Sequence, residues 1–253
     1  MRLSPILARV APLGLMLAAS LALAQNSPST DRQAEAAAAL EKLGAKLHRD
    51  AQGRVLAVWA VGLPDGDPVC AQLPSLAHLE LIEISQTKLT AAGLGQLKNC
   101  RRLRWLYLHH LPLPADALAN LQGLSDLEVL NLTATSVTDG QLATLAALPN
   151  LRVLNLSQNE ISDEGLKTLG RAAALEVLAL QKTRITGDGL KYLKDLPRLN
   201  VLNVNHCQVH DEHLKHVDPL NNLRIIHLKG CPLSDKVVKQ YRRRYPLLAF
   251  FRS

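Results

Sequence analysis

The chain is poor in aromatic residues and in sulfur. Among its 253 residues are only two Trp, four Tyr, two Phe, two Met and four Cys, although 47% of the residues are hydrophobic. A core of stacked rings is therefore excluded, and the interior must be built mainly from Leu, Val, Ile and Ala. The cysteines include no C-x-x-C pair, which argues against a structural zinc site.

Motifs that carry catalytic chemistry are also missing. The sequence has no phosphate-binding glycine loop, no nucleophile motif and no carboxylate pair in a recognisable setting. We therefore expect no enzymatic activity, no catalytic residue, no cofactor and no metal. The formal net charge of +7 aids solubility but is not by itself a nucleic-acid signature, so no nucleic-acid partner is expected.

Long apolar runs are absent except near the N-terminus. Residues 1–24 carry Arg2 and Arg9, then a short apolar run to Leu23, and end in the small-x-small pattern before Gln25. This pattern is typical of a secretory signal peptide, and the run is too short to span a bilayer. An uncleaved anchor is the alternative. We predict an exported protein, periplasmic, surface-bound or secreted, without a transmembrane span once the signal is removed.

A 24-residue period runs through the chain from residue 55. Aliphatic residues recur at this interval at Val55, Leu79, Leu103, Leu127, Leu151, Leu175, Leu199, Leu223 and Leu247. Such a period is typical of a solenoid, in which each repeat is one supersecondary unit stacked on the next. It favours a binding scaffold without naming the partner.

Residues 151–174 are the clearest copy of the repeat. Their first part, LRVLNL, alternates apolar and polar residues, which predicts a half-buried strand. Leu166 and Leu169 follow at a spacing of three, which predicts a short helix. The strand and the helix are joined by a helix-start signal, Ser162 followed by Asp163.

This pattern, with its S/T-D-x-G-L segment and cysteines at the ninth repeat position, resembles the leucine-rich repeat family, in particular its cysteine-containing and bacterial exported subclasses. The resemblance covers about residues 55–253. It implies an α/β fold: a curved right-handed horseshoe with a parallel sheet on the concave side and helices on the convex side. We expect eight repeats over residues 55–246, and a terminal strand with a C-terminal cap over residues 247–253, where the rings of Phe250 and Phe251 cover the last layer.

The segment before the repeats reads as a linker and a cap. Residues 25–54 begin with a polar stretch and continue into an Ala-rich run from Asp31 to His48, with Thr30 as a candidate N-cap. Apolar residues recur at helical spacing at Ala36, Leu40, Leu43 and Leu47. We interpret this run as one helix that covers the open first repeat; a free surface helix is the alternative.

Two columns of polar residues accompany the helices. The N-cap candidates are Thr138, Ser162, Thr186 and Ser234. The carboxylates beside the helix starts are Asp139, Asp163, Asp211 and Asp235. The aspartates suit the positive end of a helix dipole better than a calcium site, because no glycine-rich Asp loop accompanies them.

The cysteines occupy repeat positions that point inward. Cys70 and Cys100 take positions held elsewhere by leucine, so they are expected to be buried thiols. Cys207 and Cys231 are 24 residues apart and stack in neighbouring repeats. A ladder of buried thiols and a Cys207–Cys231 disulfide are both open, although parallel Cβ directions make poor disulfide geometry.

The concave face is the candidate binding site. The third, fifth, seventh and eighth positions of each repeat should face outward from the strands. Trp59, Trp105 and Tyr107 are three of only eight aromatic residues and lie there together, either as an exposed patch or packed under the N-terminal cap. The expected binding residues are Trp59, Glu83, Trp105, Tyr107, His109, Asn131, Asn155, Ser157, Gln181, Asn203, Asn205 and His227.

We expect a non-enzymatic recognition scaffold whose partner is another protein. Binding of a glycan or envelope polymer by the same lining is an alternative, as is a structural surface role without a specific ligand. A substrate receptor of the ubiquitin-ligase type is a weaker alternative, which the signal peptide argues against. A basic C-terminal helix with Lys236, Lys239 and Arg242 to Arg244 is read as a solvated face, or else as a contact for anionic material.

Overall fold

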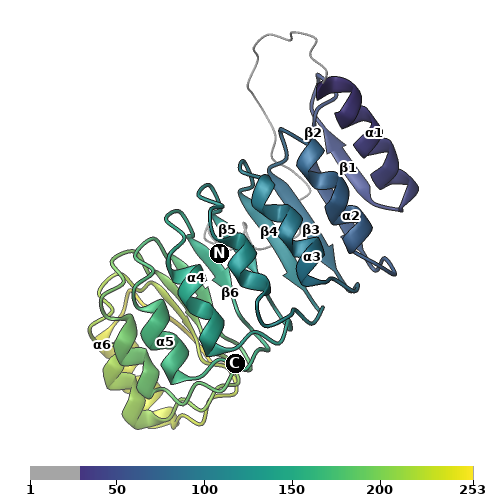
Figure 1. Ribbon diagram of the computed structural model, residues 1–253. Helices are drawn as coiled ribbons and strands as arrows, with labels where there is room; N and C mark the ends of the chain where they lie inside the picture. The colour runs from purple at the N-terminus through teal and green to yellow at the C-terminus, as the bar shows by residue number, and fades with distance from the viewer. Residues whose placement is uncertain (1–28, 253) are drawn as a thin grey trace.

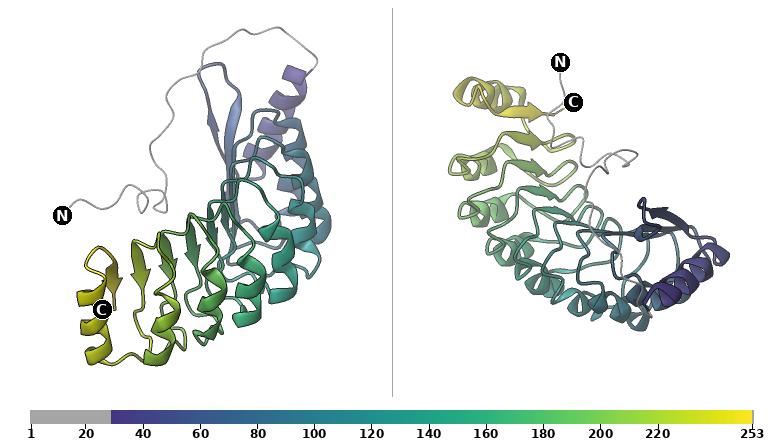
Figure 2. Two further views of the ribbon diagram at one scale, coloured as in Figure 1. Left: turned by 90° about the vertical axis from the view of Figure 1, so that its left-hand side faces the viewer. Right: turned by 90° about the horizontal axis from the view of Figure 1, so that it is seen from above.

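The computed structural model describes residues 29–252, so the predicted signal peptide and its cleavage before Gln25 lie outside the described residues. One sheet of ten strands runs through the molecule in chain order, β1 to β10. Figure 1 and Figure 2 show the strands lining one side of a curved solenoid and the helices the other. The strands are β1 (Lys46–Arg49), β2 (Val55–Val61), β3 (Leu81–Ser85), β4 (Trp105–His109), β5 (Val129–Asn131), β6 (Val153–Asn155), β7 (Val177–Ala179), β8 (Val201–Asn203), β9 (Ile225–His227) and β10 (Ala249–Phe251).

The helices of the convex side are mostly short. The α-helices are α1 (Ser29–Lys42), α2 (Asp67–Gln72), α3 (Ala91–Gly95), α4 (Leu142–Ala146), α5 (Asp163–Leu169) and α6 (Asp235–Arg244). The 3-10 helices are η2 (Leu73–Ser75), η3 (Gln96–Asn99), η4 (Ala117–Leu121), η5 (Asp139–Gln141), η6 (Asp188–Leu193) and η7 (Asp211–His216). The predicted α/β solenoid with a concave sheet and convex helices is confirmed.

Strand register follows the sequence period. Each parallel pair from β2 to β9 joins a residue to the one 24 positions later, as Trp105 pairs with Val129 and Val129 with Val153. In β4, Leu106 and Leu108 are buried, while the alternate residues Trp105, Tyr107 and His109 are partly exposed. This alternation is the half-buried strand pattern of the sequence. Residues that share a repeat position therefore stand in columns along the solenoid.

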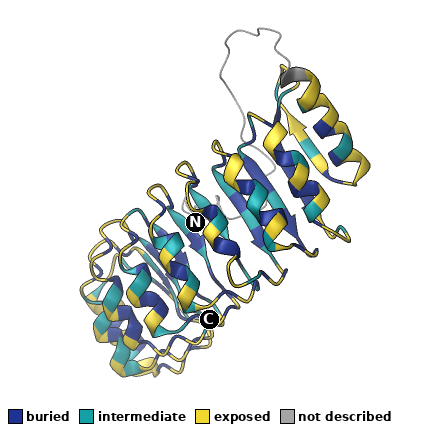
Figure 3. Ribbon diagram, viewed as in Figure 1, coloured by how far each residue is buried: buried dark blue, intermediate teal, exposed yellow. Residues whose placement is uncertain are grey.

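The core is one continuous stack of aliphatic layers. Leucines of the strands and of the helices meet between the two sides, and most are fully buried. Figure 3 shows the buried residues on the facing sides of strands and helices, with exposed residues on the outer helix faces. Cys70 and Cys100 are buried in this stack, as their repeat positions predict.

The chain leaves the sheet at the eighth position of every repeat. Residues at this position have left-handed backbone conformations, with φ from 53° to 58° in the non-glycine cases. They are Gly62, Gln86, His110, Ala134, Gln158, Lys182, His206 and Gly230. Left-handed residues turn the chain sharply but cost about 1 kcal/mol when they carry a Cβ. This column ends each strand and directs the chain toward the convex side.

The N-terminal segment differs from the expected single helix. α1 ends at Lys42, and β1 pairs antiparallel with β2, so the prediction of a helix to His48 is wrong beyond that point. Gly44, two residues after the helix, has a φ of +93°. This left-handed conformation ends a helix, and glycine adopts it at little cost because it has no Cβ. Ala36, Ala37 and Leu40 of α1 are buried against the first repeat, whereas Leu43 is 39% exposed.

The C-terminal end closes with β10 beside β9. Phe250 is buried in the last layer, as expected, but Phe251 is 46% exposed and stacks on His227 with ring centroids 4.9 Å apart. The expectation that both rings cover the last layer is therefore wrong for Phe251, because successive strand residues point to opposite faces. No helix among residues 29–252 is long and apolar enough to cross a membrane.

Candidate binding face

The concave face is built from columns of side chains that repeat register aligns. The fifth-position column runs through Trp59, Glu83, Tyr107, Asn131, Asn155, Ala179, Asn203 and His227, each paired with the next across the sheet. Apart from Ser157, which is buried, all the residues expected in the binding site are partly exposed. The structure therefore gathers these residues on one continuous surface.

An aromatic cluster occupies the N-terminal end of this face. Trp59, Trp105 and Tyr107 are half-buried on β2 and β4, with side chains on the outer side of the sheet. α1 packs against α2 and η2 on the convex side, so it does not cover the tryptophans. The guanidinium of Arg104 lies 4.5 Å from the centroid of the Trp105 ring, a cation–π contact that steadies the indole.

A carboxylate lies inside the aromatic cluster. Glu83 is flanked across the sheet by Trp59 on one side and Tyr107 on the other. Its Oε1 is 3.2 Å from Nε2 of His109. Burial raises the pKa of the Tyr107 hydroxyl, and the nearby Glu83 charge raises it further. The cluster therefore combines large apolar area with one charged hydrogen-bonding group.

Asparagines continue the fifth-position column toward the C-terminus, and their oxygens are already in use. Oδ1 of Asn131, of Asn155 and of Asn203 each accepts the backbone N–H two residues later, at 3.0 Å in every case. Within the described residues, the Nδ2 groups of these three side chains donate no hydrogen bond. The column therefore presents a row of N–H donors, which fits a ligand that carries carbonyl, carboxylate or hydroxyl oxygens.

Three of the expected site residues serve the scaffold itself. Ser157 Oγ accepts the Gln181 backbone N–H at 3.2 Å, and Asn205 Oδ1 accepts the Lys229 backbone N–H at 2.7 Å. His227 lies under the Phe251 ring, and burial lowers its pKa. These contacts join one repeat to the next, so fewer hydrogen-bonding groups and less exposed surface of these side chains remain for a partner.

All four cysteines are buried thiols in the structure. Sγ of Cys207 is 3.1 Å from the carbonyl oxygen of Leu180, and Sγ of Cys231 is 3.1 Å from that of Val204. Each thiol thus donates to a backbone carbonyl of the preceding repeat. Burial raises the thiol pKa of both residues and raises that of Cys70 to about 12.

The aspartate column connects neighbouring repeats. Carboxylates of Asp139, Asp163 and Asp211 accept the backbone N–H of the N-cap-region residue one repeat later, at 3.0, 3.2 and 2.8 Å. The residues that donate these N–H groups are Ser162, Thr186 and Ser234, respectively. Among residues 29–252, no group of three or more metal-ligating side chains is close enough to hold an ion.

The N-cap predictions hold in three of four repeats. Ser162 and Ser234 accept N–H groups of their own helices, and Thr138 precedes η5 with its N–H donated to Gln141 Oε1 at 2.9 Å. Thr186 is wrong: the N-cap of η6 is Gly187, with φ of +106°. Gly187 stands where Asp163 stands in the preceding repeat, and η6 begins one residue later, at Asp188.

A charge ladder, which is a row of charged side chains just before successive strands, was not identified from the sequence. The second repeat position alternates in sign through Glu80, Arg104, Glu128, Arg152 and Glu176. Arg104 Nη2 lies 2.7 Å from Glu128, and Arg152 Nε lies 2.8 Å from Glu176. Aligning the repeats by their second residue would have shown the alternation. The part of this ladder from Arg104 to Glu176 lines a shallow groove together with Asp126, Asn150 and Arg198.

Comparison with known proteins agrees with this geometry. A family model described as Leucine Rich repeat matches residues 147–170. The fold is similar to that of internalin C2 from Listeria monocytogenes, with a TM-score of 0.59 and 23% identity, over 85% of this chain and 93% of that one. A sequence comparison with curated proteins gives no match. At this level of identity the structural likeness establishes the fold.

Proposed function

We propose that this chain, which has the leucine-rich repeat fold, is an exported, non-enzymatic scaffold that binds another protein through its concave face. The single observation that carries the proposal is the aromatic cluster of Trp59, Trp105 and Tyr107, which lies half-exposed on that face. Aromatic residues dominate interface hot spots because they bury large area at small entropic cost.

The asparagine column supports the same proposal. Donors from Asn131, Asn155 and Asn203 match the backbone carbonyls of an extended or looped polypeptide. Glu83 adds a preference for a partner that brings a cationic side chain to the aromatic cluster. The proposal of export rests on the predicted signal peptide of residues 1–24 alone, and under it the partner belongs to the envelope or the surroundings of the cell.

Glycan binding is the second candidate, because it uses the same two features. Sugar rings stack on aromatic side chains, and sugar hydroxyls accept hydrogen bonds from amides such as those of Asn131 and Asn155. Soluble oligosaccharides separate the two candidates. Competition by oligosaccharides for the captured ligand supports glycan binding, and capture that oligosaccharides leave unchanged supports a protein partner.

Affinity capture from envelope and culture extracts tests the proposal. The bait is the chain from Gln25 onward, compared with a Trp59→Ala, Trp105→Ala, Tyr107→Ala variant. Each hot-spot truncation typically costs about 2 kcal/mol, so the variant should lose the partner. Tyr192→Ala, which removes an aromatic ring from the convex helix η6, is the matched control and should retain it. Equal capture by all three baits contradicts a concave binding site.

A further inference from the structure

The charge of the molecule is divided unevenly along the solenoid. Residues 182–252 carry 14 Lys and Arg against 6 Asp and Glu, whereas residues 29–181 carry 13 against 16. The C-terminal part therefore has a formal charge of +8 and the larger N-terminal part −3. Because charge of one sign gathered at one end creates a directed field, the C-terminal end attracts anionic surfaces.

The cause lies mainly in the last repeat. Lys167, Lys191, Lys215 and Lys239 occupy the same exposed position in four successive repeats. In the first three, an acidic residue precedes the lysine by three positions, as Glu164 precedes Lys167 with 3.5 Å between their charged atoms. In the last repeat, that position is Lys236. The acidic residue that precedes this lysine in the three earlier repeats is therefore replaced by a second cation in α6.

Within the described residues, three cations of α6 have neither a carboxylate nor a carbonyl partner. Arg244 pairs with Asp218 at 3.0 Å, and Arg242 donates to the Phe250 carbonyl oxygen at 2.9 Å. Among the described residues, no carboxylate lies within ion-pair distance of Lys236, Lys239 or Arg243, all of which are exposed. Their spacing of three and four residues places them on one face of the helix.

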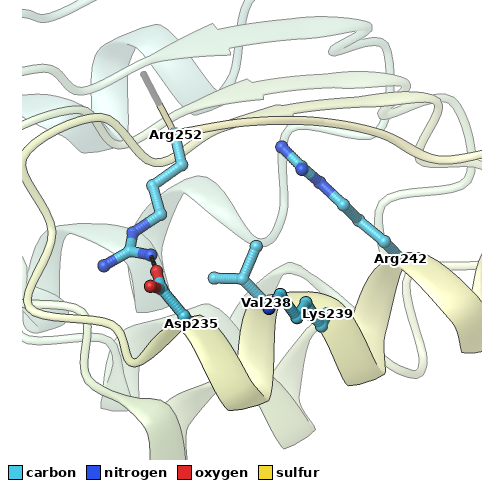
Figure 4. Close-up of a pocket in the computed structure, with 5 residues that line it drawn as sticks. All are labelled: Asp235, Val238, Lys239, Arg242 and Arg252. Atoms are coloured by element: carbon cyan, nitrogen blue, oxygen red, sulfur yellow. Dashed lines mark hydrogen bonds and ion pairs between the residues drawn. The ribbon is translucent and has the colours of Figure 1, made fainter.

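Apolar groups are exposed at the same end. Leu247 occupies the first repeat position, where residues such as Leu223 are buried, yet among the described residues it is 86% exposed. Phe251 nearby is 46% exposed. Figure 4 shows the adjoining shallow pocket, where Val238 lies between Lys239, Arg242 and the Arg252–Asp235 ion pair.

We propose that this C-terminal end, defined by Lys236, Lys239, Arg243 and Leu247, docks on the surface of an anionic lipid bilayer. Unpaired cations attract anionic headgroups, and an exposed leucine gains free energy by entering the boundary between headgroups and acyl chains. A soluble polyanion would use the cations but not Leu247. Because α6 lies on the convex side, docking there leaves the concave face free.

Vesicle co-sedimentation tests the proposal with the chain from Gln25 onward, which contains every described residue. Vesicles of phosphatidylcholine with 30% phosphatidylglycerol, about a third anionic lipid, should bind the protein, and binding should fall as salt is raised. The K236Q/K239Q/R243Q variant should bind about a hundredfold more weakly, since each basic residue near the surface contributes roughly fivefold. Leu247→Ser should weaken binding severalfold without changing charge.

The matched control removes the same number of positive charges, from the three lysines that share the repeat position of Lys239. K167Q/K191Q/K215Q should bind within about threefold of the unaltered chain, because an acidic residue stands three positions before each of these lysines, whereas Lys236 stands three positions before Lys239. Circular dichroism melts show whether each variant is folded. Equal losses in both triple variants, or equal binding to vesicles of phosphatidylcholine alone, would overturn the proposal.

Two further outcomes also overturn it. Binding to polyphosphate without binding to anionic vesicles would assign the cations to a soluble polyanion. Salt-sensitive self-association without vesicle binding would assign them to the acidic residues 29–181 of a second copy. None of these results bears on partner capture by the concave face, so the two proposals fail separately.

Discussion

At the scale of single residues, the repeats are fastened by side chains that cross from one repeat to the next. Asp163 is one such residue: its carboxylate accepts both the backbone N–H and the hydroxyl of Thr186. Glycine is required beside it, since a Cβ on Gly189 would lie 2.8 Å from the Asp163 Cα. The glycine of the repeat pattern thus serves close approach between repeats.

We predict that Asp163→Ala lowers the free energy of unfolding by about 1–2 kcal/mol. The backbone N–H of Thr186 loses its acceptor, and the chain just before η6 loses the side-chain contact that holds it to the preceding repeat. Urea denaturation followed by circular dichroism measures this. Asp195→Ala, an exposed aspartate on the same side, is the control and should change it by less than about 0.5 kcal/mol. Equal effects would contradict a role for the crossing bond.

The cysteines give a second residue-level prediction. We expect four free thiols in the denatured chain and none that reacts in the native state, because burial raises the thiol pKa values and keeps the thiolate scarce. Titration with a thiol reagent, before and after unfolding, gives both counts. Two thiols after unfolding would instead indicate the Cys207–Cys231 disulfide.

Except at Ser157, which is buried, the sequence predicts which of the expected binding residues face outward, but it does not predict what they bond to. Trp59, Asn131 and Asn155 were placed correctly because a strand's side chains alternate and the period is constant. The use of the Asn131 oxygen by the Thr133 N–H was not predictable, because it depends on how the chain turns after the strand. Repeat position sets the face, and local backbone geometry sets the hydrogen bonds.

At the scale of elements, the N-terminal cap shows where sequence pattern fails. Helical spacing placed Leu40 and Leu43 on one buried face, but Gly44 breaks the helix and the next residues form β1. A period of 3.6 and a short strand are hard to separate over so few residues. The pairing of β1 with β2 also covers an edge of the sheet that would otherwise be open.

We predict that Leu40→Ala lowers the free energy of unfolding by about 2–4 kcal/mol, because Leu40 is fully buried between α1 and the first repeat. Leu43→Ala is the matched control, with the same atoms removed from a side chain that is 39% exposed. It should cost less than about 1 kcal/mol. If both variants were equally stable, α1 would not serve as a cap.

At the scale of the whole molecule, the solenoid separates its two candidate surfaces. The aromatic cluster lies on the first three repeat strands, β2 to β4, whereas α6 belongs to the last repeat. Neighbouring strands lie about 4.8 Å apart, so five intervening strand spacings put the two surfaces roughly 25 Å apart. A molecule that docks by its C-terminal end would therefore hold the aromatic cluster away from the bilayer.

This separation gives a prediction that uses the two tryptophans as reporters, since Trp59 and Trp105 are the only ones in the chain. On anionic vesicles, their fluorescence should remain open to acrylamide in water and should not be quenched by lipids with spin labels on the acyl chains. Such quenching requires close contact between the indole and the acyl chains, which the expected separation of roughly 25 Å prevents. Spin-label quenching of either tryptophan would mean that the concave face, not the basic C-terminal end, meets the membrane.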